Sequence, residues 1–491
     1  MAKQQDTLSE IGEALCKSLG FNPTSNSTKP LYVANSLFRM CAGVRCKVDD
    51  IHEWVVSERR KATPSSQLLE TYKDAIYVSG ADAAEDLKET RFYLEKLFNP
   101  DSTVWPSLRN SVMNIPSQWL VRSFTNAEAN IGAFIYDILN TPVDGKVSKA
   151  IPLIREALKD HDDDLTRTIK PLIVRTPEAD RIEHFKPDSK DITWNGAKLI
   201  IRQGFDRLAD NCERNTTNSL LTLRRIVAYT MFAIFYYLED INRVQYGGQH
   251  IPLLLDADQR LGAIERASES CFIACKKAVE AYTTSFAAAW LCESGLITDV
   301  NSQAACEAYI ATGFSINSKN ENDKIREAIL QHIAANCQAG DEPLLATAKA
   351  IQFALYTYRY PSTTPSDFCN VLGVKAGLVG PSGNATKYKR LLINRFLLET
   401  IVLSVVDPED LEDGIDLRRL GELLRDSYRI IIGTDTDIDY ELLDSFGIAA
   451  GTPEDLRGEL SENARAIANM LISMGLAKRY ADGVTIIGWG L

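Results

Sequence analysis

The sequence predicts a mainly α, multi-domain helical protein that ends in a winged-helix-like module. Apolar residues recur at helical spacing along most of the chain, and clusters of Pro, Ser, Thr and Gly interrupt the pattern at a few places. Residues 386–491 combine helical patterns with the signal of a β-hairpin. Of the 491 residues, 45% are hydrophobic and 24% charged, the balance of a folded globular protein. At roughly 150 residues per domain, this length predicts about three folded units.

Residues 1–141 are expected to form an N-terminal helical domain. Apolar residues recur three or four positions apart from Leu8 to Leu19, and Gly20 follows as a residue that readily ends a helix. The same spacing predicts helices over residues 7–19, 82–97 and 117–139. In residues 142–192 charged and turn-forming residues become frequent, so this segment is expected to be a charged connector.

Residues 193–360 are expected to form a central helical domain. The predicted helices cover residues 195–212, 217–240, 257–294, 321–337 and 342–358. The third is rich in alanine, and small side chains let neighbouring helices approach closely, so we expect it to be central. Just before it, the segment Ile251–Asp256 forms either a strand or an extended lead-in whose Asp256 caps the helix. Residues 361–385, rich in Pro, Ser and Gly, are expected to be a linker.

Nothing in the sequence indicates a membrane or an oxidising compartment. The most apolar stretch, residues 226–238, is about 13 residues long, whereas a membrane span needs roughly 20. The first residues lack a basic stretch followed by an apolar one, so no signal peptide is expected. The ten cysteines are scattered and form no CxxC pair, which favours free thiols in a reducing compartment. We therefore expect a cytoplasmic protein without membrane contact.

Residues 386–491, the C-terminal module, carry the pattern of a winged helix. The helices expected there cover residues 386–405, 417–428, 440–446 and 453–474. Asp416 directly precedes the second of them and can cap it. After the last helix, the pair Asp482-Gly483 stands between β-prone residues, which predicts a β-hairpin. Helices followed by a terminal hairpin are the element order of a winged helix.

The charge of the C-terminal module favours a protein partner over DNA. The chain has a formal net charge of −12, and residues 381–491 hold 12 Lys and Arg against 19 Asp and Glu. Because each phosphate contact needs a cation, so acidic a surface repels a nucleic-acid backbone. A local basic face is still expected as a nucleic-acid or partner contact, and its candidate residues are Lys387, Lys389, Arg390, Arg418, Arg419, Lys478 and Arg479. The alternative is that Lys387, Lys389 and Arg390 mark only the solvated start of a helix.

No pattern in the sequence identifies a catalytic residue, a metal ligand or a cofactor site. The five histidines are isolated from one another, and no HExxH, P-loop or nucleophile-elbow motif occurs. His161 beside the acidic run 162–164 is interpreted as a solvated turn, and the pair Cys271 and Cys275 lacks further zinc ligands. Because catalytic groups can converge from distant positions, an enzyme with a dispersed active site stays open as an alternative.

A resemblance narrows the functional expectation. The chain resembles accessory subunits of bacterial anti-phage defence systems, in its run from Gly475 to Ile487, its helical body and its lead-in Pro252–Asp256. The subunits that it resembles are encoded beside motor ATPases. The G component of phosphorothioation-dependent restriction systems is one of them. The resemblance implies a non-catalytic interaction subunit of a multiprotein DNA-handling complex, which docks an ATPase or a nuclease. A winged helix that reads DNA directly would instead make the protein a DNA-binding regulator.

Overall fold

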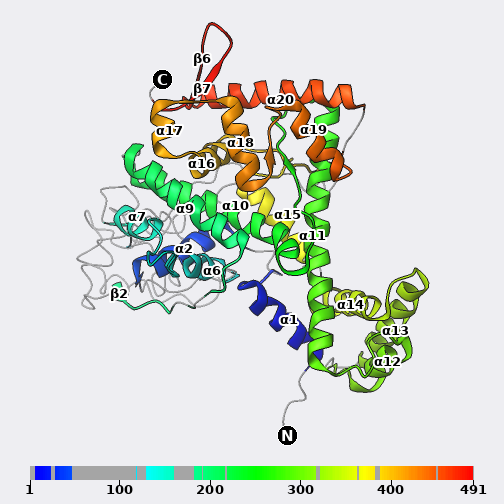
Figure 1. The fold of residues 1–491 in the computed structure, drawn as a ribbon. Helices are drawn as coiled ribbons and strands as arrows, with labels where there is room; N and C mark the ends of the chain where they lie inside the picture. Colours follow the sequence, from blue (N-terminus) through cyan, green and yellow to red (C-terminus); the bar gives the residue numbers. More distant parts are fainter. Residues whose placement is uncertain are drawn as a thin grey trace, which may run out of the picture.

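The protein is mainly α-helical (Figure 1). The computed structural model describes residues 6–23, 28–46, 118, 129–159, 182–188, 190, 192–215, 218–316, 321–361, 364–381, 388–448 and 452–489. Helices make up 68% of these residues and strands very little, which confirms the predicted mainly α class. The helix expected over 82–97, and residues 119–128 of the one expected over 117–139, lie outside the described residues.

Helices from the first half of the chain pack around the apolar helix α10. The elements are α1 (Thr7–Leu19), α2 (Pro30–Ala42), β1 (Val44–Cys46), α6 (Ile131–Asn140), α7 (Ala150–Ala157), β2 (Ile182–His184), α9 (Gly196–Asn215) and α10 (Ser219–Tyr246). β1 and β2 pair antiparallel. α1 has the predicted bounds, and Gly20 ends it with a left-handed φ of 88°. α10 contacts α2, α7, α9, α11, α15 and α16, so neighbours surround it.

The length and composition of α10 would allow it to cross a membrane, and it is the one described helix that meets this test. In the protein, however, 72% of its most apolar window is buried against other helices. Residues 229–241 are buried without interruption, which is the pattern of a helix at the centre of a large core. α10 is therefore the core helix that the other elements cover.

The long helix α11 connects two parts of the molecule (Figure 1). The elements of this region are β3 (Leu253–Leu254), α11 (Gly262–Ser294), α12 (Gln303–Ala308), the π-helix η2 (Tyr309–Gly313), α13 (Asn322–Gln338), α14 (Pro343–Ala354) and the π-helix η3 (Leu355–Arg359). Near its end, Leu291 joins a second hydrophobic cluster with α12 to α14 and with Leu8 and Ile11 of α1. α11 also contacts α10, α15 and α20, in agreement with the central position expected for it.

The range 361–385, expected to be a linker, contains a helix that belongs to the core. α15 (Pro365–Ala376) packs against α10 and α11, and Phe368 and Leu372 are completely buried. The Thr364 side chain accepts a hydrogen bond from the Asp367 amide, and the Asp367 side chain accepts one from the Thr364 amide. The prediction of a linker was wrong because Pro, Ser and Thr mark the start of this helix, where proline is favoured at the first position.

The C-terminal module contains helices and a three-stranded antiparallel sheet. Its elements are α16 (Arg395–Val405), α17 (Pro408–Asp413), β4 (Ile415–Asp416), α18 (Leu417–Tyr428), β5 (Ile430–Ile431), α19 (Thr436–Ser445), α20 (Pro453–Ser473), β6 (Ala477–Arg479) and β7 (Thr485–Ile487). The sheet has the strand order β4-β7-β6. The predicted hairpin is confirmed as β6 and β7, with Ala477 opposite Ile487 and Arg479 opposite Thr485. The Asp416 side chain caps α18, as predicted, by accepting a hydrogen bond from the Arg419 amide.

The C-terminal module shares one hydrophobic core with the rest of the chain. β3 lies parallel to β5, and the Leu253 amide donates to the Arg429 carbonyl over 2.9 Å. On the other edge of this short segment, the Asp256 amide donates to the Leu391 carbonyl over 2.8 Å. A single cluster of buried apolar residues runs from Leu15 to Ile487. The module is therefore attached through buried backbone pairing as well as through side-chain packing.

Two expectations about helix starts need correction. The helix expected over 386–405 begins only at Arg395, because the Asn394 side chain caps it there by accepting from the Leu397 amide. Before it, Arg390 pairs with Gly380 in an isolated antiparallel bridge. Of the two alternatives for Ile251–Asp256, the strand is confirmed as β3 (Leu253–Leu254), and Asp256 does not cap α11, whose N-cap is Leu261. Instead, the Glu459 side chain of α20 accepts from the first amides of α11, those of residues 263 and 264, over 2.7 and 3.0 Å.

A buried pair of tyrosines joins α10 to the C-terminal module. The hydroxyls of Tyr229 and Tyr428 are 2.7 Å apart, and Ser404 lies 3.2 Å from the Tyr428 hydroxyl. Both rings are completely buried. Gly204 of α9 lies directly against them, since a Cβ atom there would be 1.8 Å from the Tyr229 hydroxyl and 2.4 Å from that of Tyr428. Only glycine leaves room for this contact.

We predict that Gly204→Ala lowers the free energy of unfolding by about 2 kcal/mol, because the added methyl group must displace both tyrosines from a close-packed core. Urea unfolding followed by circular dichroism measures the change. Gly458→Ala on α20 is the matched control, because a methyl group there meets no atom within 4 Å. That variant should gain up to about 1 kcal/mol from higher helix propensity. Equal stability of the two variants would contradict the packing described here.

Candidate functional site

The structure separates the basic residues predicted to form one contact face. Arg390 lies in a buried ion-pair network, whereas Arg418 and Arg479 line a cleft on the surface of the C-terminal module. Lys387 lies outside the described residues. The predicted residues therefore do not form one continuous basic face in the described part of the chain.

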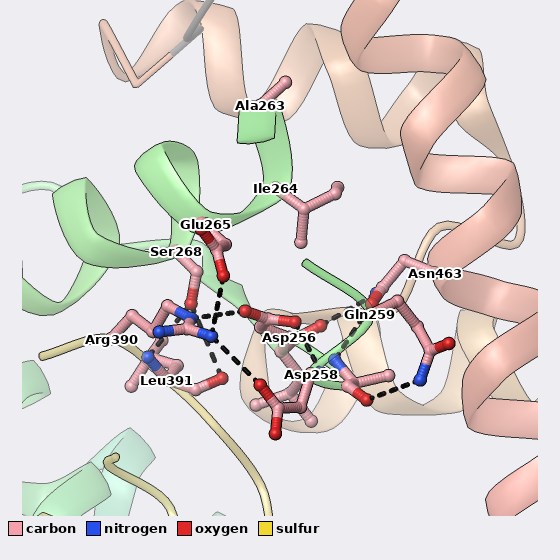
Figure 2. Close-up of polar contacts among 12 residues, drawn as sticks. Asp256, Asp258, Gln259, Ala263, Ile264, Glu265, Ser268, Arg390, Leu391 and Asn463 are labelled. Atoms are coloured by element: carbon pink, nitrogen blue, oxygen red, sulfur yellow. Dashed lines mark hydrogen bonds and ion pairs between the residues drawn. The ribbon is translucent and has the colours of Figure 1, made fainter. Parts of the chain in front are cut away.

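The Arg390 guanidinium contacts three carboxylates (Figure 2). Its Nε donates to Oδ2 of Asp256, and its Nη2 lies 3.2 Å from Oδ1 of Asp258 and 3.0 Å from Oε1 of Glu265. The side chains of Arg390 and Asp256 are only 11% and 1% exposed. Burial alone would lower the pKa of Arg390, but the three carboxylates outweigh it and raise that pKa above its ordinary value. Arg390 is thus an internal ion-pair partner and is not available to a nucleic acid.

Backbone hydrogen bonds and one asparagine complete this network (Figure 2). The Leu391 amide donates to Oγ of Ser268 on α11 over 2.9 Å. Asn463 of α20 donates to the Leu255 carbonyl over 2.8 Å and accepts from the Ala257 amide over 3.0 Å. The network thus holds α11, α20 and the residues before α16 around the segment 253–258.

We predict that Arg390→Ala lowers the free energy of unfolding by about 3 kcal/mol or more, because the variant leaves the Asp256 carboxylate buried without its partner. Urea unfolding at neutral pH measures the loss. Arg419→Ala is the control: Arg419 pairs with Glu422 over 3.0 Å at the surface, and exposed pairs contribute less than about 1 kcal/mol. If both variants had wild-type stability, the network would not be the structural element described here.

The remaining predicted residues lie at the surface of the module. Arg419 is exposed on α18 and pairs with Glu422. Lys478 is exposed on β6, with its Nζ 5.4 Å from the centre of the Tyr480 ring. Lys389 is half-buried, and burial together with the nearby Lys276 lowers its pKa. None of these three lines the cleft that contains Arg418 and Arg479.

A cleft of about 620 Å³ opens between the hairpin, α20 and the start of α18. Three arginines line it, each from a different element: Arg418 from α18, Arg465 from α20 and Arg479 from β6. We call it the arginine cleft. Its other lining residues are Asp416, Leu417, Gly433, Thr434, Thr436, Ser461, Ala464, Ala468, Gly483, Val484 and Thr485.

The three arginines differ in how strongly the protein already engages them. Arg418 pairs with Asp435 over 2.6 Å, and Arg479 donates to Oδ1 of Asn469 over 3.0 Å. Among the residues that the structure describes, none forms a hydrogen bond or ion pair with Arg465. A hydrogen bond from the Ile438 amide and, to a smaller extent, Arg418 lower the pKa of Asp435, so its carboxylate is charged. The cleft thus holds one free guanidinium and two that share their hydrogen bonds.

Sequence reasoning singled out Arg418 and Arg479 but not Arg465. From the sequence, Arg465 entered only the charge count of residues 381–491. A signal was present, because small residues surround it on one face of α20, at Ser461, Ala464 and Ala468. Small side chains at this spacing leave room beside an arginine. Without knowing where the hairpin lies, however, that face cannot be distinguished from an ordinary packing surface.

Among the described residues, the group that could hold a metal ion lies elsewhere, near the end of α10. Ligand atoms of Glu239, Asp240 and His250 lie within 4.8 Å of one another. Glu239 is 1% exposed, and within the part of the chain that the structure describes neither of its carboxylate oxygens has a hydrogen-bond partner. Burial raises the pKa of Glu239 well above its ordinary value and lowers the pKa of His250 to about 4. Sequence reasoning did not single out this group, because His250 is distant from the two acids in the chain.

Two arginines already face this group. Arg243 donates to both carboxylate oxygens of Asp240, over 2.6 and 2.8 Å. The Arg429 Nε lies 3.4 Å from Nδ1 of His250. These guanidiniums place positive charge beside Asp240 and His250, and neither of them forms a hydrogen bond with Glu239.

Comparison of the chain with protein-family models finds no match, and comparison with curated proteins finds none either.

Proposed function

We propose that this chain is a non-catalytic interaction subunit of a multiprotein DNA-handling complex in bacterial anti-phage defence, and that it acts in the cytoplasm. Its C-terminal module would be a winged-helix-like domain that docks a motor ATPase or a nuclease. The observation that carries the proposal is the exposed hairpin on a module whose other side is buried in the helical body (Figure 1). The body holds the module firmly, and the hairpin is presented to a partner.

The order and pairing of the elements support a winged helix. α18, α19 and α20 precede the hairpin, and β4 completes a sheet of order β4-β7-β6 with the hairpin strands. The loop 480–484 would be the wing, closed by a hydrogen bond from the Tyr480 amide to the Val484 carbonyl over 2.9 Å. α20 is the helix directly before the hairpin, the position of a recognition helix.

The side chains of the hairpin tip support a protein partner. Tyr480 and Val484 are 44% and 43% exposed. An exposed tyrosine beside an aliphatic residue is typical of the centre of protein interfaces, where aromatic anchors contribute most of the binding energy. The neighbouring helix α20 exposes Glu454 and Glu462, which disfavours a nucleic-acid backbone along its length.

A DNA-binding regulator is the second candidate, favoured by one observation. Arg418, Arg465 and Arg479 line a cleft on the same face of the module as the hairpin, where a winged helix would contact DNA. Direct DNA binding would weaken steeply as salt concentration rises, because cations that contact phosphates displace counterions. Fluorescence anisotropy with duplex DNA over a salt series distinguishes this candidate from a docking subunit.

We predict that Tyr480→Ser combined with Val484→Ser lowers recovery of the partner in pull-down of the endogenous complex by about tenfold, because the change removes the apolar anchor of the interface. Mass spectrometry of the recovered proteins measures the loss. Tyr388→Ser is the matched control, because Tyr388 is 71% exposed but does not lie on the hairpin. Recovery of the wild-type chain as a monomer, with neither an ATPase nor a nuclease, would contradict the proposal.

A further inference from the structure

We infer that the arginine cleft binds the phosphate group of a small phosphate-bearing molecule. The inference deepens the proposed function, since it rests on the same exposed face of the C-terminal module and names a ligand class for it. Guanidinium groups bind phosphate oxygens with paired, charge-assisted hydrogen bonds. The cleft presents three such groups, from three separate elements, toward one space.

Arg465 and Arg479 provide the main binding groups. Arg465 projects from α20 and is exposed, with no ion-pair partner in the described part of the chain. Arg479 projects from β6, where its Nε lies 3.4 Å from Oγ1 of Thr485 and its Nη2 contacts Asn469. Both of these contacts are to neutral groups, so the positive charge of Arg479 is not neutralised. The helix and the hairpin strand therefore each contribute one uncompensated cation to the cleft.

Two residues with hydroxyl side chains, Ser461 and Thr485, also line the cleft and offer hydrogen-bond donors of the kind that phosphate requires. Thr434 lines the cleft as well, but its Oγ1 is buried against Gly421 of α18, where a Cβ atom would lie 1.8 Å from it. The Thr434 hydroxyl is therefore not one of the donors.

Asp435 competes with the ligand. Its carboxylate holds Arg418 over 2.6 Å, and a bound phosphate would have to share that guanidinium with it. Asp435 also caps α19, where its side chain accepts from the Ile438 amide. Asparagine caps helices as well as aspartate does, so Asp435→Asn removes the competing charge while the cap remains.

The size and surroundings of the cleft favour a small ligand over a nucleic-acid duplex. Its volume of about 620 Å³ is within the range of roughly 300–1,000 Å³ typical of small-molecule sites. Asp416 lies in the lining of the cleft, and the exposed carboxylates Asp437, Glu462 and Asp482 are each next to a lining residue in the chain. A polyanion that extended beyond the cleft would meet these charges, whereas one phosphate group would meet mainly the arginines.

Isothermal titration calorimetry at low ionic strength tests the inference on the full chain, with inorganic pyrophosphate, AMP and a short duplex DNA as separate probes. We expect pyrophosphate or AMP to bind, and Arg465→Ala combined with Arg479→Ala to weaken binding by about tenfold or more. Asp435→Asn should bind the same probe more tightly than the wild type. Arg395→Ala is the matched control, because Arg395 is an exposed cation of the module that does not line the cleft. Thermal unfolding verifies that every variant is folded.

Three results would overturn the inference. The first two are no heat of binding with either small probe, and equal affinity of the wild type and the double arginine variant for the small probe. The third is duplex DNA that binds the wild type more tightly than both small probes and loses affinity in the double arginine variant. Pull-down with the double arginine variant separates this inference from the proposed function. A wild-type protein that recovers its partner but binds neither small probe would refute only the ligand of the cleft, and recovery of the partner by the double arginine variant would show that docking does not need that ligand. Loss of the partner through Tyr480→Ser alone would not bear on the ligand, because Tyr480 does not line the cleft.

Discussion

The ion pair between Asp256 and Arg390 is the contact on which the arrangement of the C-terminal half depends. Asp256 is almost completely buried, and an unpaired charge there would cost several kcal/mol. Its partner lies 134 residues further along the chain, so the contact forms only when the segment before α16 has reached its final position. Because the neighbouring backbone groups pair with β5 on one edge and with Leu391 on the other, charge and backbone pairing specify the same position for this segment.

The consequence is a C-terminal module that cannot move independently of the body. α11 receives its N-terminal cap from Glu459 of α20, and Asn463 of the same helix binds the backbone on either side of Asp256. The tyrosine pair of α10 and α18 adds a second buried contact. The exposed parts of the module include the hairpin, one face of α20 and the start of α18. The surface that these three elements share is where the arginine cleft lies.

Local signals in the sequence predicted local structure well. The bounds of α1, the Asp416 cap of α18 and the hairpin were all predicted, because each depends on residues only a few positions apart. The Thr364–Asp367 capping box was equally local, yet the proline beside it was interpreted as a sign of a linker. Local patterns thus reveal helix ends, but they do not reveal whether a turn-rich segment enters the core.

Contacts between distant residues could not be predicted in this way. Asp256 has the sequence context of a helix cap and Arg390 that of a surface cation, and only the fold brings them together. The arginine cleft was found in part, since Arg418 and Arg479 were candidates, while Arg465 required the hairpin to be placed beside α20. Because net charge averages over a whole module, it did not reveal three cations gathered in one cleft of an acidic surface.

Native-state hydrogen exchange at increasing denaturant tests most directly whether the module and the body form one structural unit. Amides of the segment 253–256 and of the hairpin strands should exchange through the same global opening, because one core and one ion-pair network hold both. Exchange of the hairpin and α20 at a lower free energy of opening, while the helices around α10 stay protected, would show an independently unfolding domain and would contradict this account.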